Sequence, residues 1–264
     1  MFEPIIKGKV FKMIEKDLGF VLKRYNFRET SLITTLYTLR FGKIRGIFKG
    51  FYTSKKEFSS PLDIFSLNEF VFYPKRNEIW LISHADLVSD FSYLRQNLSK
   101  AKVGAILFNL LDKIMPLWDR NEHIFDLINN CLNSLKQEEG FKILYVFLIK
   151  FLSFSGFKPE FNHCIKCQKV LDDEFSFSVA KGGLICRACT YQVTDVKKIS
   201  KQACRCLLYI QGVDFSLTSR LKVTKACEEE IFYILGRFLA YHFEFYDLIN
   251  SDFFPASSEL VSRY

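Results

Sequence analysis

Two pairs of cysteines have the spacing of metal ligands. Cys164 and Cys167 form one C-x2-C knuckle, Cys186 and Cys189 form a second, and eighteen residues separate the pairs. Two residues between cysteines let one tight turn point both sulfurs at a single ion, and two such turns complete a tetrahedron of thiolates. The sequence therefore predicts one structural Zn²⁺ per chain, with no open position for catalysis.

Other uses of these cysteines are less well supported. A thioredoxin-type dithiol stands alone after a strand of a βαβ unit, whereas here two knuckles occur together. A disulfide is expected in an oxidising compartment, but residues 1–11 have no uninterrupted apolar stretch typical of an export signal, so we expect a cytoplasmic protein. His163 adjoins the first knuckle and stays an alternative ligand. The remaining cysteines are expected to be buried, unreactive thiols: Cys131, Cys204, Cys206 and Cys227.

The residues between the knuckles predict the hairpin of a zinc ribbon. Residues 175–179 alternate as a strand, Gly182 and Gly183 supply a turn, and the chain then returns to the second knuckle. We expect the ribbon to occupy residues 161–192 as an insertion.

A helical pattern surrounds the ribbon. Apolar residues recur at spacings of three and four before and after it, which predicts one helical domain in two parts, residues 86–160 and 193–264. Asp119 is the expected N-cap of the second helix and Gly140 its expected end. The expected helices run from 101 to 115, from Asp119 to Gly140, from 141 to Gly156, from 201 to 209 and from 224 to 248.

The first 85 residues instead have the pattern of short strands. They are rich in β-branched and aromatic residues and are separated by turn-forming ones. Five strands in so short a segment favour a small barrel of the OB type. The expected strands are residues 19–25, 31–38, 43–50, 61–73 and 78–84.

The positive charge of the chain is concentrated in this segment. The net charge is +8, and residues 1–60 hold thirteen basic side chains against five acidic ones, so the rest of the chain sums to zero. Such a bias favours a polyanionic partner, although a basic face kept for solubility is the alternative interpretation.

Cations and aromatics alternate where this charge lies. Period two places Lys43, Arg45 and Lys49 on one face of the third strand, as a row that can face phosphates. Phe51 and Tyr52 follow, and exposed rings of this kind stack on bases of single strands. The candidate nucleic-acid contacts are Arg24, Arg40, Lys43, Arg45, Lys49, Lys55, Lys56, Phe51 and Tyr52.

From residue 19 to about 250, the chain resembles the RecO family of bacterial DNA repair and recombination mediators. The likeness lies in the order of several segments. They are Gly19-Phe-Val-Leu-Lys-Arg-Tyr, residues 28–38, Phe41-Gly-Lys-Ile-Arg-Gly-Ile-Phe-Lys-Gly, residues 61–70, Gly156-Phe-Lys-Pro and the two knuckles. Residues 1–18 precede the usual start of the family, and we expect them to add a strand or an arm.

The resemblance implies an α+β multidomain fold, with an N-terminal OB-fold β-barrel followed by an α-helical domain that carries an inserted four-cysteine zinc ribbon. It implies a protein that binds single- and double-stranded DNA and anneals single strands. Its implied partners are RecR, the C-terminal tail of the single-strand binding protein and, indirectly, RecA, whose loading it promotes in the RecF pathway. The implied location is the cytoplasm, in association with the nucleoid and not with a membrane.

Two other classes of protein fit parts of the sequence. An RNA-binding or ribosome-associated zinc-ribbon protein would also combine a basic barrel with a ribbon. An enzyme is a weaker alternative, because a zinc deaminase needs an H-x-E motif before its cysteines and no such motif precedes Cys164. We therefore expect a protein without catalytic activity.

Overall fold

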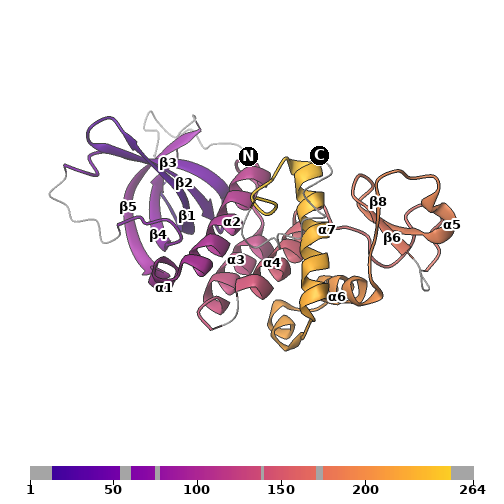
Figure 1. The fold of residues 1–264 in the computed structure, drawn as a ribbon. Helices are drawn as coiled ribbons and strands as arrows, with labels where there is room; N and C mark the ends of the chain where they lie inside the picture. Colours follow the sequence, from indigo (N-terminus) through magenta and orange to yellow (C-terminus); the bar gives the residue numbers. More distant parts are fainter. Residues whose placement is uncertain (1–13, 54–60, 75–77, 138–139, 171–174, 251–264) are drawn as a thin grey trace. The chain divides into compact units, whose positions relative to one another are not determined.

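The described part of the chain falls into two units. The computed structural model describes residues 14–53, 61–74, 78–137, 140–170 and 175–250. The described residues up to Ser92, together with Met115–Phe125, form the first unit. The second consists of Tyr93–Ile114 and the described residues from Asp126 onward. Figure 1 shows strands in the first unit, and helices with a small separate sheet in the second.

The first unit is a closed five-stranded barrel. Its strands follow one another around the barrel in the order β1-β2-β3-β5-β4, which confirms the barrel expected from the sequence. β3 and β5 pair in parallel, and the other neighbouring strands are antiparallel. The strands are β1 (Glu15–Phe27), β2 (Ser31–Thr38), β3 (Gly42–Phe48), β4 (Leu67–Tyr73) and β5 (Ile79–Ser89).

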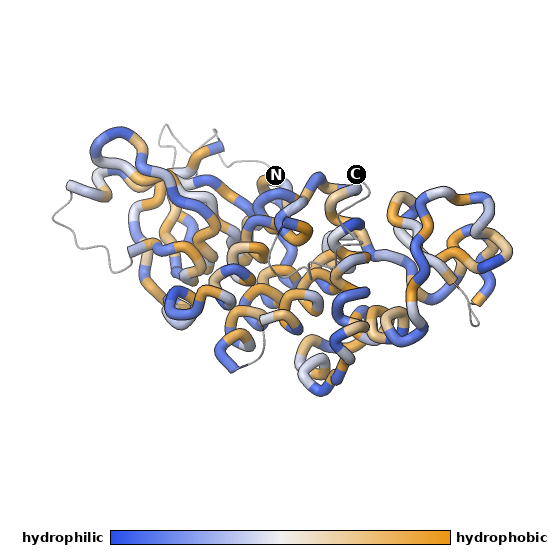
Figure 2. The backbone as a smooth tube through the Cα atoms, in the orientation of Figure 1, coloured by the Kyte–Doolittle hydropathy of each residue, from blue (hydrophilic) through white to orange (hydrophobic). Residues whose placement is uncertain are grey.

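Alternation along the strands fills the barrel with apolar side chains. In β3, Ile44, Gly46 and Phe48 are buried while Arg45 between them is exposed, as period two predicts. Phe70 and Phe72 of β4 stack inside with ring centroids 5.6 Å apart. Burying each such ring contributes about 1.5–3 kcal/mol, so the barrel has a substantial core of its own. Figure 2 shows the alternation of hydrophilic and hydrophobic residues along the strands.

Three strand ends differ by more than two residues from those expected. β4 begins at Leu67 rather than at residue 61, because Leu62 and Phe65 have φ angles of 52° and 76° that an extended strand does not allow. β1 begins at Glu15, four residues early, because residues 15–20 pair with β4. β5 continues to Ser89 for the same reason. The expected strand or arm in residues 1–18 therefore contributes residues 15–18 to β1, and its remainder, residues 1–13, lies outside the described residues.

A connecting segment, Met115–Phe125, packs on the outside of the barrel. The backbone N–H of Trp118 donates to the carbonyl of Lys43 at 2.9 Å, and the hydroxyl of Tyr37 donates to the carbonyl of Asn121 at 3.4 Å. The backbone of Asp119 lies very close to Gly42, which has a φ of +64°. A Cβ at Gly42 would lie 2.0 Å from the carbonyl oxygen of Asp119. This segment therefore belongs structurally to the barrel.

The helices of the second unit surround one buried helix, α4 (Gly140–Phe154). Its residues from Ile143 to Leu152 are all buried, and it contacts α2 (Leu98–Ile114), α6 (Lys201–Gly212) and α7 (Lys225–Phe243). α4 therefore forms the centre of this unit. Within the described residues, no helix combines the length and the apolar character needed to cross a membrane. The unit also contains α1 (Ser92–Gln96), most of α3 (Glu122–Ser134) and the 3-10 turn Phe215–Arg220.

Two expected ends of the second helix were wrong. Asn121, not Asp119, precedes α3, and its side-chain oxygen accepts from the N–H of Ile124 at 3.2 Å. A capping side chain can reach only two or three residues ahead, which excludes Asp119 for a helix that begins at Glu122. Gly140 begins α4 and does not end α3, which stops at Ser134.

The last helix is shorter than expected. α7 ends at Phe243, because Glu244 has a φ of 50°, its N–H donates to the carbonyl of Ala240, and the N–H of Phe245 donates to the carbonyl of Leu239. This left-handed residue closes the helix and turns the chain. Phe245 and Leu248 are buried beyond this end, so their apolar pattern reflects packing and not continued helix.

The ribbon is a three-stranded sheet in the order β7-β6-β8. β6 (Phe175–Ser178) and β7 (Gly183–Cys186) form the expected hairpin. β8 (Val196–Lys198) pairs antiparallel with β6 and was not expected from the sequence. Asp195, just before β8, accepts from the hydroxyl of Ser178 at 2.9 Å and from the N–H of Ala180 at 2.6 Å, which ties β8 to the hairpin.

Candidate metal centre and nucleic-acid interface

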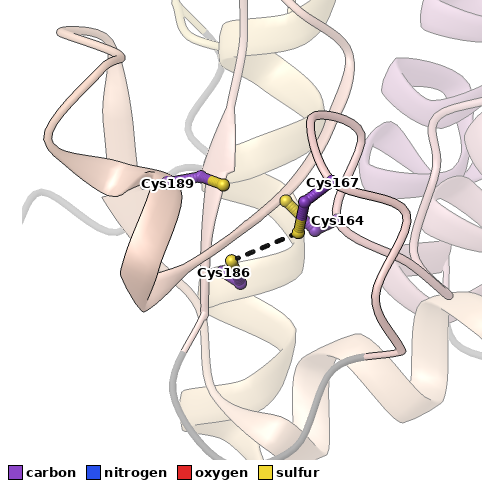
Figure 3. A group of neighbouring side chains, drawn as sticks. All are labelled: Cys164, Cys167, Cys186 and Cys189. Carbon is purple, nitrogen blue, oxygen red and sulfur yellow. Dashed lines mark hydrogen bonds between the residues drawn. The ribbon is translucent and has the colours of Figure 1, made fainter.

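The four knuckle cysteines come together at one point. Their sulfurs all lie within 4.8 Å of one another, and this cluster can hold a metal ion. Figure 3 shows the side chains of Cys164, Cys167, Cys186 and Cys189 gathered from the two knuckles. Cys164 is buried, whereas Cys167 is exposed.

Two local turns aim the sulfurs. In the first knuckle the N–H of Gln168 donates to the carbonyl of Cys164 at 2.8 Å, and Gln168 takes a φ of 61° to complete the turn. In the second, Cys186 ends β7 and is the N-cap of α5 (Arg187–Thr190), which carries Cys189 one turn later. Each pair is therefore positioned by backbone geometry that its own short sequence encodes.

The sulfur spacing fits a tetrahedral metal site. A Zn–S bond is about 2.3 Å, so the sulfurs of a regular tetrahedron around zinc lie about 3.8 Å apart. The sulfurs of Cys167 and Cys186 are 3.7 Å apart. His163 takes no part in the cluster, since its ring nitrogens lie 3.3 Å from a Glu160 oxygen and 3.1 Å from the Asn162 amide nitrogen. The donor set is thus four thiols, which is the set that a structural zinc ion prefers.

The protonation of the cluster is uneven. Burial opposes ionisation of Cys164, but N–H groups of Cys186, Cys167 and Lys166 are directed at its sulfur and lower the pKa of this thiol to about 6. The pKa of Cys189 is raised to about 12, mainly by hydrogen bonding to Cys186 and to a smaller extent by desolvation. The thiol of Cys164 therefore ionises more readily than that of Cys189, and a bound cation would displace protons from the cluster.

The other four cysteines behave as core residues. All are buried, and burial raises the pKa of Cys204 to about 11 and that of Cys227 to about 12. Thiols with such pKa values are protonated and unreactive at neutral pH. Their position confirms the expectation of buried thiols for Cys131, Cys204, Cys206 and Cys227.

The candidate DNA contacts on β3 share one outward face, but they differ in exposure. Arg45 is exposed and lies 3.8 Å from Glu78, whereas Lys43 is half-buried where Met115–Phe125 packs on the barrel. Lys49 is exposed directly after the strand. The strand register places Thr35 beside Arg45 and Lys23 beside Thr35, so Lys23 adds a cation to this face.

Two of the remaining candidate cations, Arg24 and Arg40, do not join this row. Arg24 donates to the carbonyl of Pro61 at 3.0 Å and to Asp63 at 3.3 Å. Arg40 lies 3.2 Å from a Glu15 carboxylate oxygen, and its guanidinium is 5.1 Å from the centre of the Phe41 ring. Both guanidinium groups are thus engaged within the barrel. Lys55 and Lys56 lie outside the described residues.

The two candidate aromatic residues have different environments. Phe51 packs partly into the barrel core, 5.9 Å from the ring of Phe48. Tyr52 is 46% exposed, and its hydroxyl donates to Asn26 at 2.5 Å. Tyr52 is therefore the more accessible ring of the pair.

Further exposed rings were missed by the sequence reasoning. Tyr25 and Phe27, at the end of β1, are 52% and 39% exposed, and the guanidinium of Arg28 lies 5.3 Å from the Phe27 ring centre. A bulge between Val21 and Lys23 shifts the alternation of β1, which hides their outward direction from a simple period-two pattern. In register, Tyr25 begins an outer apolar row with one residue from each strand, namely Tyr25, Ile33, Ile47, Leu81 and Tyr73.

Comparison with known proteins identifies the family of this chain. The family model "Recombination protein O N terminal" matches residues 13–91, and "Recombination protein O C terminal" matches residues 95–248. The chain belongs to the RecO family. The two matched regions together span the barrel, the helices and the ribbon, so the RecO resemblance seen in the sequence motifs is confirmed.

Curated RecO proteins match over most of their length. The DNA repair protein RecO of Caldicellulosiruptor saccharolyticus is 31% identical over 211 residues, which cover 80% of this chain and 85% of the relative. The DNA repair protein RecO of Alkaliphilus metalliredigens is 26% identical over 234 residues, covering 88% and 95%. That of Desulforamulus reducens is 27% identical over 227 residues, covering 86% and 88%. Membership of the RecO family places the chain among DNA repair proteins.

Proposed function

We propose that this chain is a mediator of DNA repair and homologous recombination. It binds single- and double-stranded DNA, anneals complementary single strands, and acts with RecR and the single-strand binding protein to promote RecA loading in the RecF pathway. One observation carries the proposal. Both RecO family models match a chain whose barrel presents cations and exposed aromatic rings on its outer face.

The barrel is proposed to bind DNA through contacts with the phosphate backbone of the nucleic acid. Arg45, Lys49 and Lys23 contact phosphates, while Tyr25 and Tyr52 give bases a face on which to stack. Such contacts do not distinguish one base from another, so binding is independent of sequence. A strand held in this way keeps its base edges accessible, and this favours annealing with a complementary strand.

The four-cysteine cluster is proposed to bind one structural Zn²⁺ ion per chain. Four thiolates fill the tetrahedron and leave no position for water or substrate, so the ion stabilises the ribbon and supplies no Lewis-acid chemistry. The protein is accordingly proposed to have no catalytic activity. Labelled strands incubated with protein, magnesium and ATP should remain intact, and cleavage that follows the protein through two columns would contradict this part of the proposal.

The proposed partners follow from RecO membership. The helical unit is proposed to bind the acidic, apolar tail of the single-strand binding protein, since an amphipathic tail suits a groove between helices with a cation at its rim. The proposed location is the cytoplasm, in association with the nucleoid. A synthetic tail peptide titrated into the full chain tests the contact, and a peptide with its terminal apolar residues replaced by Ser is the control.

Strand annealing with and without single-strand binding protein tests the main proposal. The chain should accelerate pairing of complementary strands both when they are bare and when they are coated. No acceleration in either case would contradict a mediator role. Stronger binding to structured RNA than to single-stranded DNA in direct competition would instead support an RNA-binding zinc-ribbon protein.

A further inference from the structure

A cavity lies beside the ribbon. Its volume is about 850 Å³. It is lined by residues from β6, from α5, from the end of β8 and from the start of α6, with Glu230 of α7 at its wall. All of these segments belong to the second unit.

Three cations from three different elements line this cavity. They are Arg187 of α5, Lys198 of β8 and Lys201 of α6, and all three side chains are exposed. One carboxylate, that of Glu230, lines it as well. Glu230 accepts from the N–H of Ser200 at 2.6 Å and also from the Ser200 hydroxyl, so it fixes the start of α6. The wall therefore carries an excess of positive charge that suits an anion.

The start of α6 adds to this potential. Ser200 is the N-cap of the twelve-residue helix α6, and its hydroxyl accepts from the N–H of Ala203 at 3.1 Å. The positive end of the helix dipole therefore lies at the cavity, next to Lys201. The Glu230 carboxylate bonded to Ser200 offsets part of this helix-end potential, so the three cations are the main features that favour a phosphate.

Aromatic surface lies beside these charges. Tyr191, directly after α5, is 81% exposed and lines the cavity, as does the buried ring of Phe175. Cations together with an exposed ring are the combination by which proteins hold a single strand, with phosphates on the cations and a base on the ring. An acidic peptide would use the cations but gives no reason for an exposed tyrosine beside them.

We propose that this cavity is a second nucleic-acid site, at which Arg187, Lys198 and Lys201 contact phosphates and Tyr191 stacks on a base. The inference rests on the proposed DNA-binding function and extends it. One chain would then hold two strands, one on the barrel and one on the ribbon. Arg187 lies within the second cysteine knuckle and Tyr191 follows it, so the order of this site depends on the four-cysteine cluster.

Two experiments on the full chain test the site. In the first, an oligothymidine strand carrying 5-iodouracil is cross-linked by light and the attached peptides are mapped. Cross-links are expected at Tyr191 as well as on the barrel. In the second, the chain is saturated with one immobilised strand and then offered a second, non-complementary strand. Replacing Arg187, Lys198 and Lys201 by Ala should weaken capture of the second strand about tenfold or more, because this removes all three proposed phosphate contacts.

A matched variant distinguishes an effect of the cavity cations from an effect of the net charge of the chain. Lys169, Lys181 and Lys222 are also exposed and do not line the cavity, and replacing all three by Ala removes the same charge. This control should capture the second strand as the unaltered chain does. Metal content must be equal in both variants, because Arg187 follows a knuckle cysteine.

Other outcomes would contradict the inference. Cross-links confined to the barrel, with equal capture by both triple variants, would disprove the ribbon site and leave the proposed function intact. If the variant that lacks the three cavity cations captures DNA normally but no longer binds an Asp-rich peptide, the cavity would be assigned to an acidic peptide instead. Absence of cross-links anywhere, with no annealing, would contradict the proposed function itself.

Discussion

Substitution of one knuckle cysteine at a time tests whether a metal ion stabilises the ribbon. Four sulfurs within 4.8 Å of one another are a costly arrangement without a cation, because neighbouring thiolates repel each other. Replacing Cys186 by Ser should therefore abolish stoichiometric zinc binding and lower solubility, since metal binding contributes to folding of such modules. Metal analysis of freshly purified, reduced protein measures this directly.

A buried cysteine outside the cluster provides the control for this prediction. Cys204 donates to the carbonyl of Phe161 at 3.4 Å, a contact that serine can also make. The Cys204→Ser variant should keep one zinc ion per chain. Normal zinc content in Cys186→Ser, or no zinc in the unaltered protein, would show that the cluster has another role.

Acid should release the metal because protons compete with it for the sulfurs, and the pKa of Cys164 contributes to this pH dependence. The lowered pKa of this thiol means that it stays ionised down to about pH 6, below which protons compete for all four sulfurs. Zinc affinity should therefore fall as the pH decreases and fall most steeply below about pH 6. A competition titration with a zinc-binding dye at several pH values measures this slope, and an affinity independent of pH would exclude thiolate ligation.

The exposed rings of the barrel make a separate prediction at the same scale. Stacking on one base contributes about 1–3 kcal/mol, so replacing Tyr25 by Ala should weaken single-strand binding about tenfold. Tyr25→Phe keeps the ring and should bind as before. Fluorescence anisotropy with a labelled oligothymidine strand measures both. Equal loss in the two variants would show that the hydroxyl, and not the stacking face, is what matters.

At the scale of elements, one glycine joins the barrel to Met115–Phe125. Gly42 combines a φ of +64° with a backbone neighbour 2.0 Å from where a Cβ would stand. Gly42→Ala should lower the free energy of unfolding by about 2 kcal/mol or more, from backbone strain together with displacement of this segment. Urea unfolding followed by tryptophan fluorescence is suitable, because Trp80 and Trp118 have ring centroids 4.7 Å apart.

Another glycine separates these two causes. Gly50 has a φ of +69°, but a Cβ there would meet only the hydroxyl of Thr53, at 3.6 Å. Gly50→Ala should therefore cost only the backbone strain, about 1 kcal/mol. If both variants lose the same stability, the contact with Met115–Phe125 contributes nothing.

For the molecule as a whole, DNA binding is expected to depend on where the positive charge lies. The net excess of +8 lies in residues 1–60, and β3 presents part of it on one face. Binding of a single strand releases about 0.7 counterions per phosphate contact. Replacing Lys43, Arg45 and Lys49 together by Ala should thus flatten the salt dependence of affinity by up to about two units and slow annealing, with zinc content unchanged.

Equal charge removed elsewhere provides the comparison. Lys113, Lys136 and Lys158 are exposed residues of the second unit, and their replacement by Ala lowers the net charge by the same amount. This variant should retain most of the salt slope. If the two variants behave alike, the basic strand is only a solvated face and binding depends on overall charge.

Local patterns in the sequence were sufficient for much of the fold and for the cysteine cluster. The cysteine spacing predicted the cluster because each knuckle is a short turn whose geometry depends on its own residues. The faces of β3 followed from alternation, because period two depends only on the extended backbone. The order of the RecO motifs indicated the family, which the comparisons confirmed.

Tertiary structure decided which of these residues are accessible and what they contact. Lys43 is half-buried because Met115–Phe125 packs beside it, and Arg24 and Arg40 are engaged by residues distant in sequence. β8 joins the ribbon, and the cavity beside it is assembled from several separated segments. The spacing of residues that are close in sequence does not determine these contacts. They depend on which distant segments pack together, and that is settled by the burial of apolar surface across the whole unit.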